Sequence, residues 1–482
     1  MRRAKIVATL GPSLDDPERL RAAVAAGIDV VRLNFSHGGP DEHAARLAAV
    51  RRIGEQLGRN IGSLGDLQGP KIRLGVVPDE GVELVDGGEV ALLAGRESLD
   101  DYEDGGVPVL PVVYEQLAND VEPGAIVLID DGLLRLVVSH VEDDRIFARV
   151  VAGGRALPRK GVNLPGVRVS ARSLTDKDRA DVATMVELGV DWIALSFVRA
   201  PEDVEEVRDL VRELGGPQPI VAKLERPEAV DNLEDILEVS DAVMVARGDL
   251  GVEIGPERVP AIQKEMIDLA NRASKPVITA TEMLDSMIRN PRPTRAEASD
   301  VANAIFDGTD AVMLSGETAA GRYPVEAVRT MARVIEVAES AAERVHPMPP
   351  VTASRLPNVV AKAAVQVAED VGAVAIAVFS FSGSSVQLVS KFRPRHPILG
   401  LTVEESAMHR LALMWGTDGA TVPEKDHSRD LIAAAEEACL TRGLGVRGDA
   451  VVIVSGVPGG HGGTNRVMVH RLGEPVVGDV RA

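Results

Sequence analysis

The sequence predicts an α/β fold: a (β/α)₈ TIM barrel with an inserted small β-barrel lid domain and a C-terminal open α/β sheet domain. Short runs rich in Val, Ile and Ala recur along the first two-thirds of the chain, and most are separated by about one helix's length of sequence. About eight such β-then-α units with right-handed crossovers close naturally into a barrel. An open doubly wound sheet is the alternative architecture.

The predicted barrel strands lie at residues 6–9, 30–34, 61–66, 192–197, 220–224, 242–246, 277–281 and 311–315. In the segments between these strands, residues typical of helix ends mark where helices should begin and end. A helix should begin at Asp16 and Pro17 and end at Gly27. Two further segments resemble capping boxes followed by glycine stops, namely Thr175 with Asp178 and Gly189, and Thr294 with Glu297 and Gly308.

One strand spacing predicts an inserted domain. Consecutive strands start about 25–35 residues apart, but well over a hundred residues separate the third from the fourth. Within this insertion apolar and polar residues alternate, and Gly, Asp and Pro mark turns, which is typical of a small antiparallel β module. Its expected strands are 82–85, 90–93, 126–129, 133–138 and 146–151. We expect a lid at residues 72–169 over the face where barrel active sites form.

A third domain is expected after the Pro-rich stretch at residues 346–350. Its predicted strands are 375–379, 398–401, 451–454 and 467–470, with helices between them. The predicted domains are therefore a barrel at 1–71 and 170–345, the lid at 72–169, and an α/β regulatory domain at 346–482.

Composition excludes several classes of protein. The net charge of -20 argues against nucleic acid or an anionic membrane as a main partner. The single cysteine, Cys439, rules out a disulfide framework and suits a reducing compartment. Neither a signal peptide nor a stretch long enough to span a membrane is apparent, so we expect a cytoplasmic protein.

Polar and charged residues gather where the predicted barrel strands end, and in a barrel these ends face the active site. A short apolar strand, for example, runs directly into Arg247, Gly248 and Asp249, where a glycine lets an anion approach the backbone. The full set comprises Arg32, Asn34, Ser36, Asp66, Lys71, Arg73, Lys223, Glu225, Gly248, Asp249, Thr279, Thr281, Ser315 and Glu317.

These residue types predict phosphoryl transfer. Glu225 and Asp249 supply hard oxygens for one divalent cation that keeps most of its waters. Lysines and arginines around them suit a phosphate or a carboxylate, and positioning with charge neutralisation provides most of the catalysis in such reactions. The alternative is a ring of structural ion pairs, of which Lys223 with Glu225 would be one.

At these residues the chain resembles the pyruvate kinase family along essentially its whole length. The resemblance rests on residues 5–12 (KIVATLGP), 32–38 (RLNFSHG), 69–73 (GPKIR), 160–166 (KGVNLPG), 222–225 (AKLE), 244–253 (MVARGDLGVE), 283–288 (MLDSMI), 290–297 (NPRPTRAE) and 310–318 (DAVMLSGET). It implies transfer of the phosphoryl group from phosphoenolpyruvate to ADP, giving ATP and pyruvate. It also implies a homotetramer with a phosphorylated allosteric effector.

The resemblance assigns roles by position. Lys223 neutralises the transferring phosphoryl group, and Arg32 contacts the phosphate. Glu225 and Asp249 hold Mg²⁺, with Mn²⁺ as a substitute, while the amides of Gly248 and Asp249 bind the substrate carboxylate with Thr281. The nucleotide phosphates meet Asn34, His37, Arg73 and Lys160, although His37 is equally typical of a packed or capping histidine. Candidates for protonating the enolate, with water, are Thr281, Ser315 and Glu317.

One departure from the family concerns K⁺. Many relatives need K⁺ and carry a threonine and a glutamate where this chain has Leu67 and Lys71. The remaining K⁺ ligands, Asn34, Ser36 and Asp66, are retained. We expect the ammonium of Lys71 to serve this monovalent cation position, so that K⁺ is not required; the alternative is a solvated surface lysine. A second departure is Glu282, where relatives usually have Gln, and we expect little chemical effect from it.

The third domain offers a candidate effector site. Its first strand leads into Ser380, Ser382, Gly383, Ser384 and Ser385 at the start of a helix, where hydroxyls and amides suit a phosphate. The glycine-rich segment 456–465 could close over it. Serine capping and a mobile loop are the alternative. Fructose bisphosphate, a hexose monophosphate and AMP all remain open as effectors.

Two other functions compete with the kinase. A metal-dependent aldolase or lyase acting on pyruvate-like enolates also uses Glu, Asp and Arg in a barrel, but it leaves Lys223, Lys160 and the third domain without a role. A catalytically silent regulatory protein of this fold has no need of Lys223, Glu225, Asp249 and Thr281 together.

Overall fold

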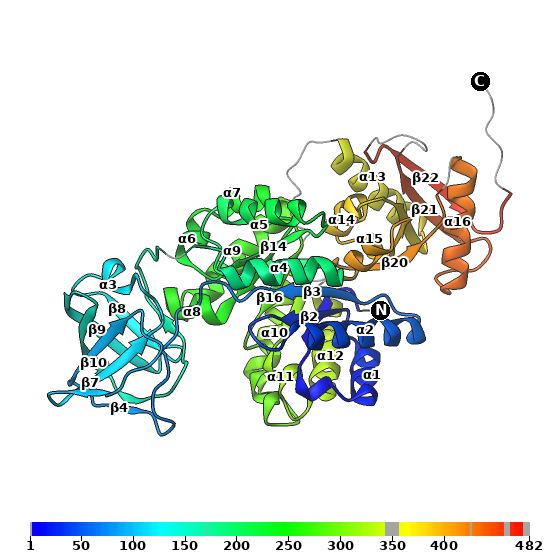
Figure 1. Cartoon of the computed structure of the whole chain (residues 1–482). Coiled ribbons are helices and arrows are strands. Elements are labelled where there is room, and N and C mark those ends of the chain that lie inside the picture. Colours follow the sequence, from blue (N-terminus) through cyan, green and yellow to red (C-terminus); the bar gives the residue numbers. More distant parts are fainter. Residues whose placement is uncertain (1, 171, 343–355, 425–426, 457–462, 476–482) are drawn as a thin grey trace.

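The computed structural model describes residues 2–170, 172–342, 356–424, 427–456 and 463–475. Figure 1 shows three bodies: a central barrel, a β module in cyan on one side of it, and an α/β domain in yellow to red on the other side. This arrangement confirms the predicted fold class. Within the described residues no helix combines the length and apolar composition needed to cross a membrane.

The barrel is closed by eight parallel strands in the order β1-β17-β16-β15-β14-β13-β3-β2. Their bounds lie within two residues of the predicted ones: β1 (Lys5–Thr9), β2 (Val30–Asn34), β3 (Gly62–Asp66), β13 (Trp192–Leu195), β14 (Ile220–Leu224), β15 (Ala242–Ala246), β16 (Val277–Ala280) and β17 (Ala311–Leu314). Thr281 and Ser315 therefore come just after their strands rather than within them. All eight strands reach the active-site end in the same direction, because every pairing is parallel.

Helices surround the barrel, with bounds α1 (Pro17–Ala26), α2 (Pro40–Leu57), α4 (Asp176–Leu188), α5 (Pro201–Glu213), α6 (Pro227–Asp231), α7 (Leu233–Val239), α8 (Arg247–Ile254), α9 (Val259–Arg272), α10 (Arg295–Asp307), α11 (Gly316–Ala319) and α12 (Pro324–Ala342). Short 3₁₀ turns lie at η1 (Pro12–Leu14) and η2 (Asp285–Ile288). The predicted caps are confirmed. Asp16 accepts from the Arg19 amide, and Thr175 and Thr294 both form complete capping boxes.

The inserted domain, for which we keep the name lid, is a mainly antiparallel β module with its own apolar core. It contains β4 (Val82–Leu84), β5 (Glu89–Ala94), β6 (Glu103–Asp104), β7 (Val107–Val112), α3 (Leu117–Asp120), β8 (Ile126–Ile129), β9 (Leu134–Glu142), β10 (Arg145–Ala152), β11 (Gly154–Ala156) and β12 (Val162–Asn163). Seven strands form one sheet, in the order β12-β8-β9-β10-β5-β7-β6, and β11 pairs with β4. The segments entering and leaving the lid run side by side, because Arg73 forms an antiparallel bridge with Gly161.

The C-terminal domain is an open sheet in the order β20-β19-β18-β21-β22, in which β22 is antiparallel to β21. Its elements are α13 (Leu356–Val371), β18 (Ala375–Phe379), α14 (Ser384–Lys391), β19 (Ile398–Thr402), α15 (Glu405–Arg410), η3 (Leu411–Leu413), β20 (Thr417–Thr421), α16 (Ser428–Thr441), β21 (Ala450–Ser455) and β22 (Arg466–Arg471). Strand β20 was not predicted. The Pro-rich stretch 346–350 lies outside the described residues.

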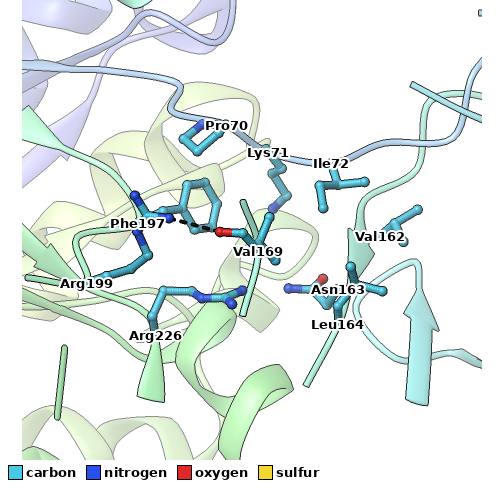
Figure 2. Close-up of a pocket in the computed structure, with 10 residues that line it drawn as sticks. All are labelled: Pro70, Lys71, Ile72, Val162, Asn163, Leu164, Val169, Phe197, Arg199 and Arg226. Atoms are coloured by element: carbon cyan, nitrogen blue, oxygen red, sulfur yellow. Dashed lines mark hydrogen bonds between the residues drawn. The ribbon is translucent and has the colours of Figure 1, made fainter. Parts of the chain in front are cut away.

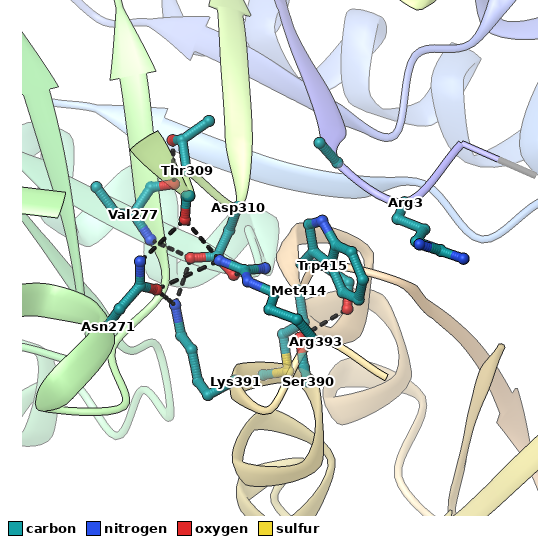
Figure 3. Close-up of polar contacts among 12 residues, drawn as sticks. Arg3, Asn271, Val277, Thr309, Asp310, Ser390, Lys391, Arg393, Met414 and Trp415 are labelled. Atoms are coloured by element: carbon teal, nitrogen blue, oxygen red, sulfur yellow. Dashed lines mark hydrogen bonds and ion pairs between the residues drawn. The ribbon is translucent and has the colours of Figure 1, made fainter. Parts of the chain in front are cut away.

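A buried charge cluster fixes this domain to the base of the barrel (Figure 3). Lys391, the last residue of α14, pairs with Asp310 just before β17, and its ammonium also lies 2.9 Å from Asn271 Oδ1. Arg393 donates to the other oxygen of Asp310 at 2.9 Å. Burial alone would raise the pKa of Asp310, but the charges of Arg393 and Lys391 outweigh it and hold that pKa below its usual value. The cluster therefore keeps an ionised carboxylate between the two domains.

Candidate active site

Lys223 lies at the centre of the charged residues that the barrel strands bring together. Its ammonium is 3.0 Å from Glu225 Oε1, 3.2 Å from Asp66 Oδ1 and 2.7 Å from the Ser196 hydroxyl. These residues come from the ends of three adjacent strands, β14, β3 and β13. Burial alone would lower the pKa of Lys223, but the negative charges of Asp66 and Glu225 outweigh it and raise that pKa above its usual value. The ammonium therefore keeps its proton.

Asp66 is shared by two cations. Arg32 Nε donates to its second oxygen at 2.6 Å, and Arg32 also reaches the Thr9 hydroxyl at 3.1 Å. Burial would raise the pKa of Asp66, yet Lys223 and Arg32 outweigh it and lower that pKa. Asp66 is therefore an ionised anchor that positions Lys223 and Arg32.

Glu225 is held by contacts to both of its oxygens. Besides its pair with Lys223, it accepts from the Phe197 amide at 2.8 Å. Burial raises the pKa of Glu225, Lys223 lowers it, and the nearby charge of Asp249 raises it again, for a net increase. The carboxylates of Glu225 and Asp249 are therefore close enough to repel each other.

Gly248 and Asp249 lie in the first turn of helix α8, which begins directly after β15. The amides of Gly248 and Asp249 therefore belong to the start of a helix. The Gly248 amide donates to the Thr281 hydroxyl at 2.7 Å, and Thr281 has a left-handed backbone with φ of 66°. An anion at this amide would therefore meet Thr281 as well, which brings the predicted carboxylate-binding residues together.

The carboxylates of Glu225 and Asp249 fit a magnesium ion in number and chemistry. Two protein carboxylates suit an ion that keeps several waters for substrate oxygens. In the described ranges no cluster of three or more His, Cys, Asp or Glu residues could hold a metal instead. Each carboxylate is paired with a lysine here, Glu225 with Lys223 and Asp249 with Lys71.

Lys71, expected to serve the K⁺ position, pairs with Asp249 in this structure. Its ammonium lies 3.0 Å from Asp249 Oδ1 rather than against Asn34, Ser36 or Asp66. The physical reason is charge: Asp66 is already neutralised by Arg32 and Lys223. The predicted ligands are otherwise near one another, because Asn34 Oδ1 accepts from the Ser36 amide at 3.2 Å and Asn34 pairs in register with Asp66.

Leu67, placed at the same monovalent site, is buried with 1 % exposure in the core beneath the barrel helices. Its carbonyl accepts from the Ser196 hydroxyl at 2.6 Å. The leucine side chain offers no oxygen, so only its backbone belongs to the polar network.

The predicted nucleotide-binding residues lie in two separate places. His37 follows β2, where its amide donates to the Asn34 carbonyl at 3.1 Å. Arg73 and Lys160 lie in the two segments that join lid and barrel; Arg73 donates to the Arg159 carbonyl, and Lys160 pairs with Asp130 of the lid at 2.9 Å. Among the described residues no hydrogen bond or ion pair joins the two groups.

The residues predicted to relay a proton are partly structural. Glu317, in α11, accepts from the Ser315 amide at 2.7 Å and from the Leu284 amide at 3.0 Å, and burial raises its pKa. The Ser315 hydroxyl is buried without a hydrogen-bond partner in the described part of the chain. Thr279 is fully buried and donates to Thr309, so it stays in the core.

Several residues of the site escaped the sequence analysis. Ser196 could have been found, because it directly follows a barrel strand like the residues that were selected. A cavity of about 40 Å³ lies where the lid meets the barrel. Figure 2 shows the residues that line it: Pro70, Lys71, Ile72, Val162, Asn163, Leu164, Val169, Phe197, Arg199 and Arg226. Asn163 lies within the 160–166 motif and Arg226 directly follows the 222–225 motif, but neither was assigned a role, and only the fold brings them together.

The candidate effector site is a compact turn before α14. The Ser380 hydroxyl accepts from the Gly383 amide at 3.1 Å and from the Ser385 amide at 3.4 Å. Ser382 donates to the Ser384 hydroxyl at 3.1 Å, and Ser385 hydrogen-bonds Thr464. Gly383 has φ of 88°, which favours glycine. Residues 457–462 of the glycine-rich segment lie outside the described residues.

Comparison with known proteins gives a consistent result. The family model "Pyruvate kinase, barrel domain" matches residues 1–328, and "Pyruvate kinase, alpha/beta domain" matches residues 358–470. Pyruvate kinase of Mycobacterium intracellulare is 46% identical over 474 residues, covering 98% of this chain and 99% of that protein. That of Agrobacterium vitis is 45% identical over 476 residues, with the same coverage. A crystal structure of a pyruvate kinase from Cryptosporidium parvum superimposes with a TM-score of 0.89 at 36% identity, covering 98% of this chain and 96% of that one.

Proposed function

The chain belongs to the pyruvate kinase family, and it is a phosphotransferase that moves the phosphoryl group of phosphoenolpyruvate to ADP, giving ATP and pyruvate; we propose that the residues around Lys223 carry out this transfer. The observation that supports this most strongly is the buried ammonium of Lys223, fixed between Asp66 and Glu225. A positive charge held in place before the reaction stabilises negative charge as it develops, without reorganisation.

Lys223 and Arg32 bind the phosphoryl group in this proposal. Lys223 neutralises charge on the bridging oxygen, and Arg32 orients the phosphate. Asp66 serves both by holding each cation in place through its two oxygens. The substrate carboxylate binds the amides of Gly248 and Asp249 with the Thr281 hydroxyl, a set supported by the 2.7 Å contact between Gly248 and Thr281.

Glu225 and Asp249 would hold Mg²⁺, the usual cofactor of the family, with Mn²⁺ as a substitute. When bound, the ion supplies positive charge that neutralises phosphoryl and carboxylate oxygens. Lys71 leaves Asp249 to make room for it, and its ammonium is then free to serve the monovalent position beside Asn34, Ser36, Asp66 and the Leu67 backbone.

The enolate carbon receives its proton from a relay of water with Thr281, Ser315 and Glu317. Thr281 is the member in direct contact with the carboxylate-binding amide of Gly248. Glu317 positions this region through the Ser315 and Leu284 amides, and burial raises its pKa. The ADP phosphates contact Asn34, His37, Arg73 and Lys160, and the lid brings Arg73 and Lys160 to the site.

We further propose that the enzyme is active without K⁺, is a homotetramer, and binds a phosphorylated effector at Ser380, Ser382, Gly383, Ser384 and Ser385. K⁺ independence is supported by the apolar side chain at Leu67 and the extra positive charge at Lys71. The effector site is supported by hydroxyls gathered at the start of α14.

One assay separates the kinase from its rivals. Purified protein is incubated with phosphoenolpyruvate, ADP and Mg²⁺, and pyruvate is followed through lactate dehydrogenase. We expect turnover that requires ADP. A lyase would act without ADP, and a regulatory protein would give no turnover; either result contradicts the proposal.

A further inference from the structure

Glu253 links the lid to the helix that carries Asp249. It is 7 % exposed and lies in α8, one helical turn after Asp249. One of its carboxylate oxygens, Oε1, accepts from two donors: the side-chain amide of Asn163 at 3.1 Å and the guanidinium of Arg226 at 2.8 Å. Hydrogen bonds to a buried carboxylate are among the stronger contacts in proteins.

Asn163 belongs to the segment by which the chain leaves the lid. This segment is paired with the entering one, since the Val162 amide donates to the Ile72 carbonyl at 2.9 Å and the Leu74 amide to the Lys160 carbonyl at 2.8 Å. Asn163 therefore lies where these two segments, 72–74 and 160–163, join the lid to the barrel. We call this junction the hinge. In Figure 2 its side chain points toward Arg226 across the junction of lid and barrel.

Arg226 and Glu253, the two barrel residues in this hinge contact, each lie close in sequence to a proposed metal ligand. Arg226 directly follows Glu225, and its guanidinium also reaches the Val167 carbonyl on the lid side at 3.3 Å. Glu253 follows Asp249 by four residues on the same short helix. Residues four apart lie on one face of a helix and move together, because its backbone is held by hydrogen bonds.

We propose that Glu253 is a positioning residue, which with Asn163 and Arg226 ties the orientation of the lid to the placement of Asp249 opposite Glu225. The inference rests on the proposed function in one respect, that these two carboxylates bind the divalent cation. It follows that loosening the hinge contact weakens cation binding from a distance, although Asn163 is no ligand.

The test is Mn²⁺ binding to the whole protein, measured by electron paramagnetic resonance without substrate or nucleotide. Asn163→Ala removes the lid donor and leaves the pair of Arg226 with Glu253 intact. We expect its Kd for Mn²⁺ to rise about fivefold or more, the factor that one lost hydrogen bond produces. Asn163→Asp places a carboxylate against Glu253 and should weaken binding further. Hydrogen exchange of the α8 amides should quicken in both variants.

Ser170→Ala is the matched control, because Ser170 also lies after the lid but bonds Asp120 and not α8. Its Kd for Mn²⁺ should equal that of the wild type. If an Asn163 variant fails to fold, Glu253→Gln is measured instead, because it keeps the shape of the side chain. It should also weaken Mn²⁺ binding. Wild-type affinity and exchange rates in Asn163→Ala and Glu253→Gln overturn the positioning role while leaving the proposed function intact. Failure of the wild type itself to bind Mn²⁺ overturns the proposed metal site, and this inference with it.

Discussion

Replacing Lys391 with methionine tests the buried junction between the barrel and the C-terminal domain. Lys391 has 1 % side-chain exposure, and burial lowers the pKa of its ammonium from 10.5 to about 8, even though Asp310 raises it. Methionine is similar in length and carries no charge. Asp310 keeps two partners in the variant, Arg393 at 2.9 Å and the Val277 amide at 2.8 Å, so no buried charge is left alone.

The expected signature is a change in how stability depends on pH. Below about pH 8 the amine is protonated in both folded and unfolded chains. Between about pH 8 and 10.5 the unfolded chain holds a proton that the folded chain has lost, so raising the pH stabilises the folded state. At about 1.4 kcal/mol for each pH unit, this lowered pKa corresponds to at most about 3.5 kcal/mol. The Lys391→Met variant should lack this gain.

The assay is guanidinium unfolding of wild type and variant from pH 7.5 to 10, followed by tryptophan fluorescence. Trp415 is a suitable probe, because the Arg393 guanidinium lies 4.9 Å from the centre of its ring. Lys362→Met, at an exposed position of α13, is the control and should behave as the wild type does. An identical rise in stability with pH in wild type and Lys391→Met would refute the reasoning.

Two other predictions concern ligands. Lys71→Glu removes the positive charge beside Asp249 and should make activity depend on K⁺. Activity is compared in KCl and in tetramethylammonium chloride at equal ionic strength. Equal activity of the variant in the two salts would contradict this prediction, as would strong activation of the wild type by KCl. Ser384→Asp puts a carboxylate at the start of α14, where it repels a phosphate. It should abolish activation by whichever of fructose bisphosphate, glucose 6-phosphate or AMP activates the wild type, without changing the basal rate. Retained activation would remove this site from regulation.

The barrel could be predicted because its signals are local. Each strand is a short apolar run, and caps such as Thr175 with Asp178 act within one helical turn. The strands that escaped prediction lack such runs. Strand β7 is interrupted by Pro108 and Pro111, and β20 is mostly Thr, Asp and Gly.

The site could be predicted as a set of residues but not as a set of contacts. Lys223, Glu225 and Asp249 could be identified because each lies at the end of a predicted strand, and all parallel strands of a barrel end at one face. The partner of Lys71 is 178 residues away in sequence, and Asp66 was assigned to a cation site although two side chains neutralise it. Which charge pairs with which depends on distances that only the closed barrel sets.

The most direct test of the assigned chemistry is the turnover number of Lys223→Met at saturating phosphoenolpyruvate, ADP and Mg²⁺. The variant keeps most of the length of the side chain and removes the charge between Asp66 and Glu225. If that charge stabilises the transferring phosphoryl group, kcat should fall at least about 10²–10³-fold while the protein stays folded. A folded variant that turns over at nearly the wild-type rate would contradict the role of Lys223, and with it the proposed mechanism.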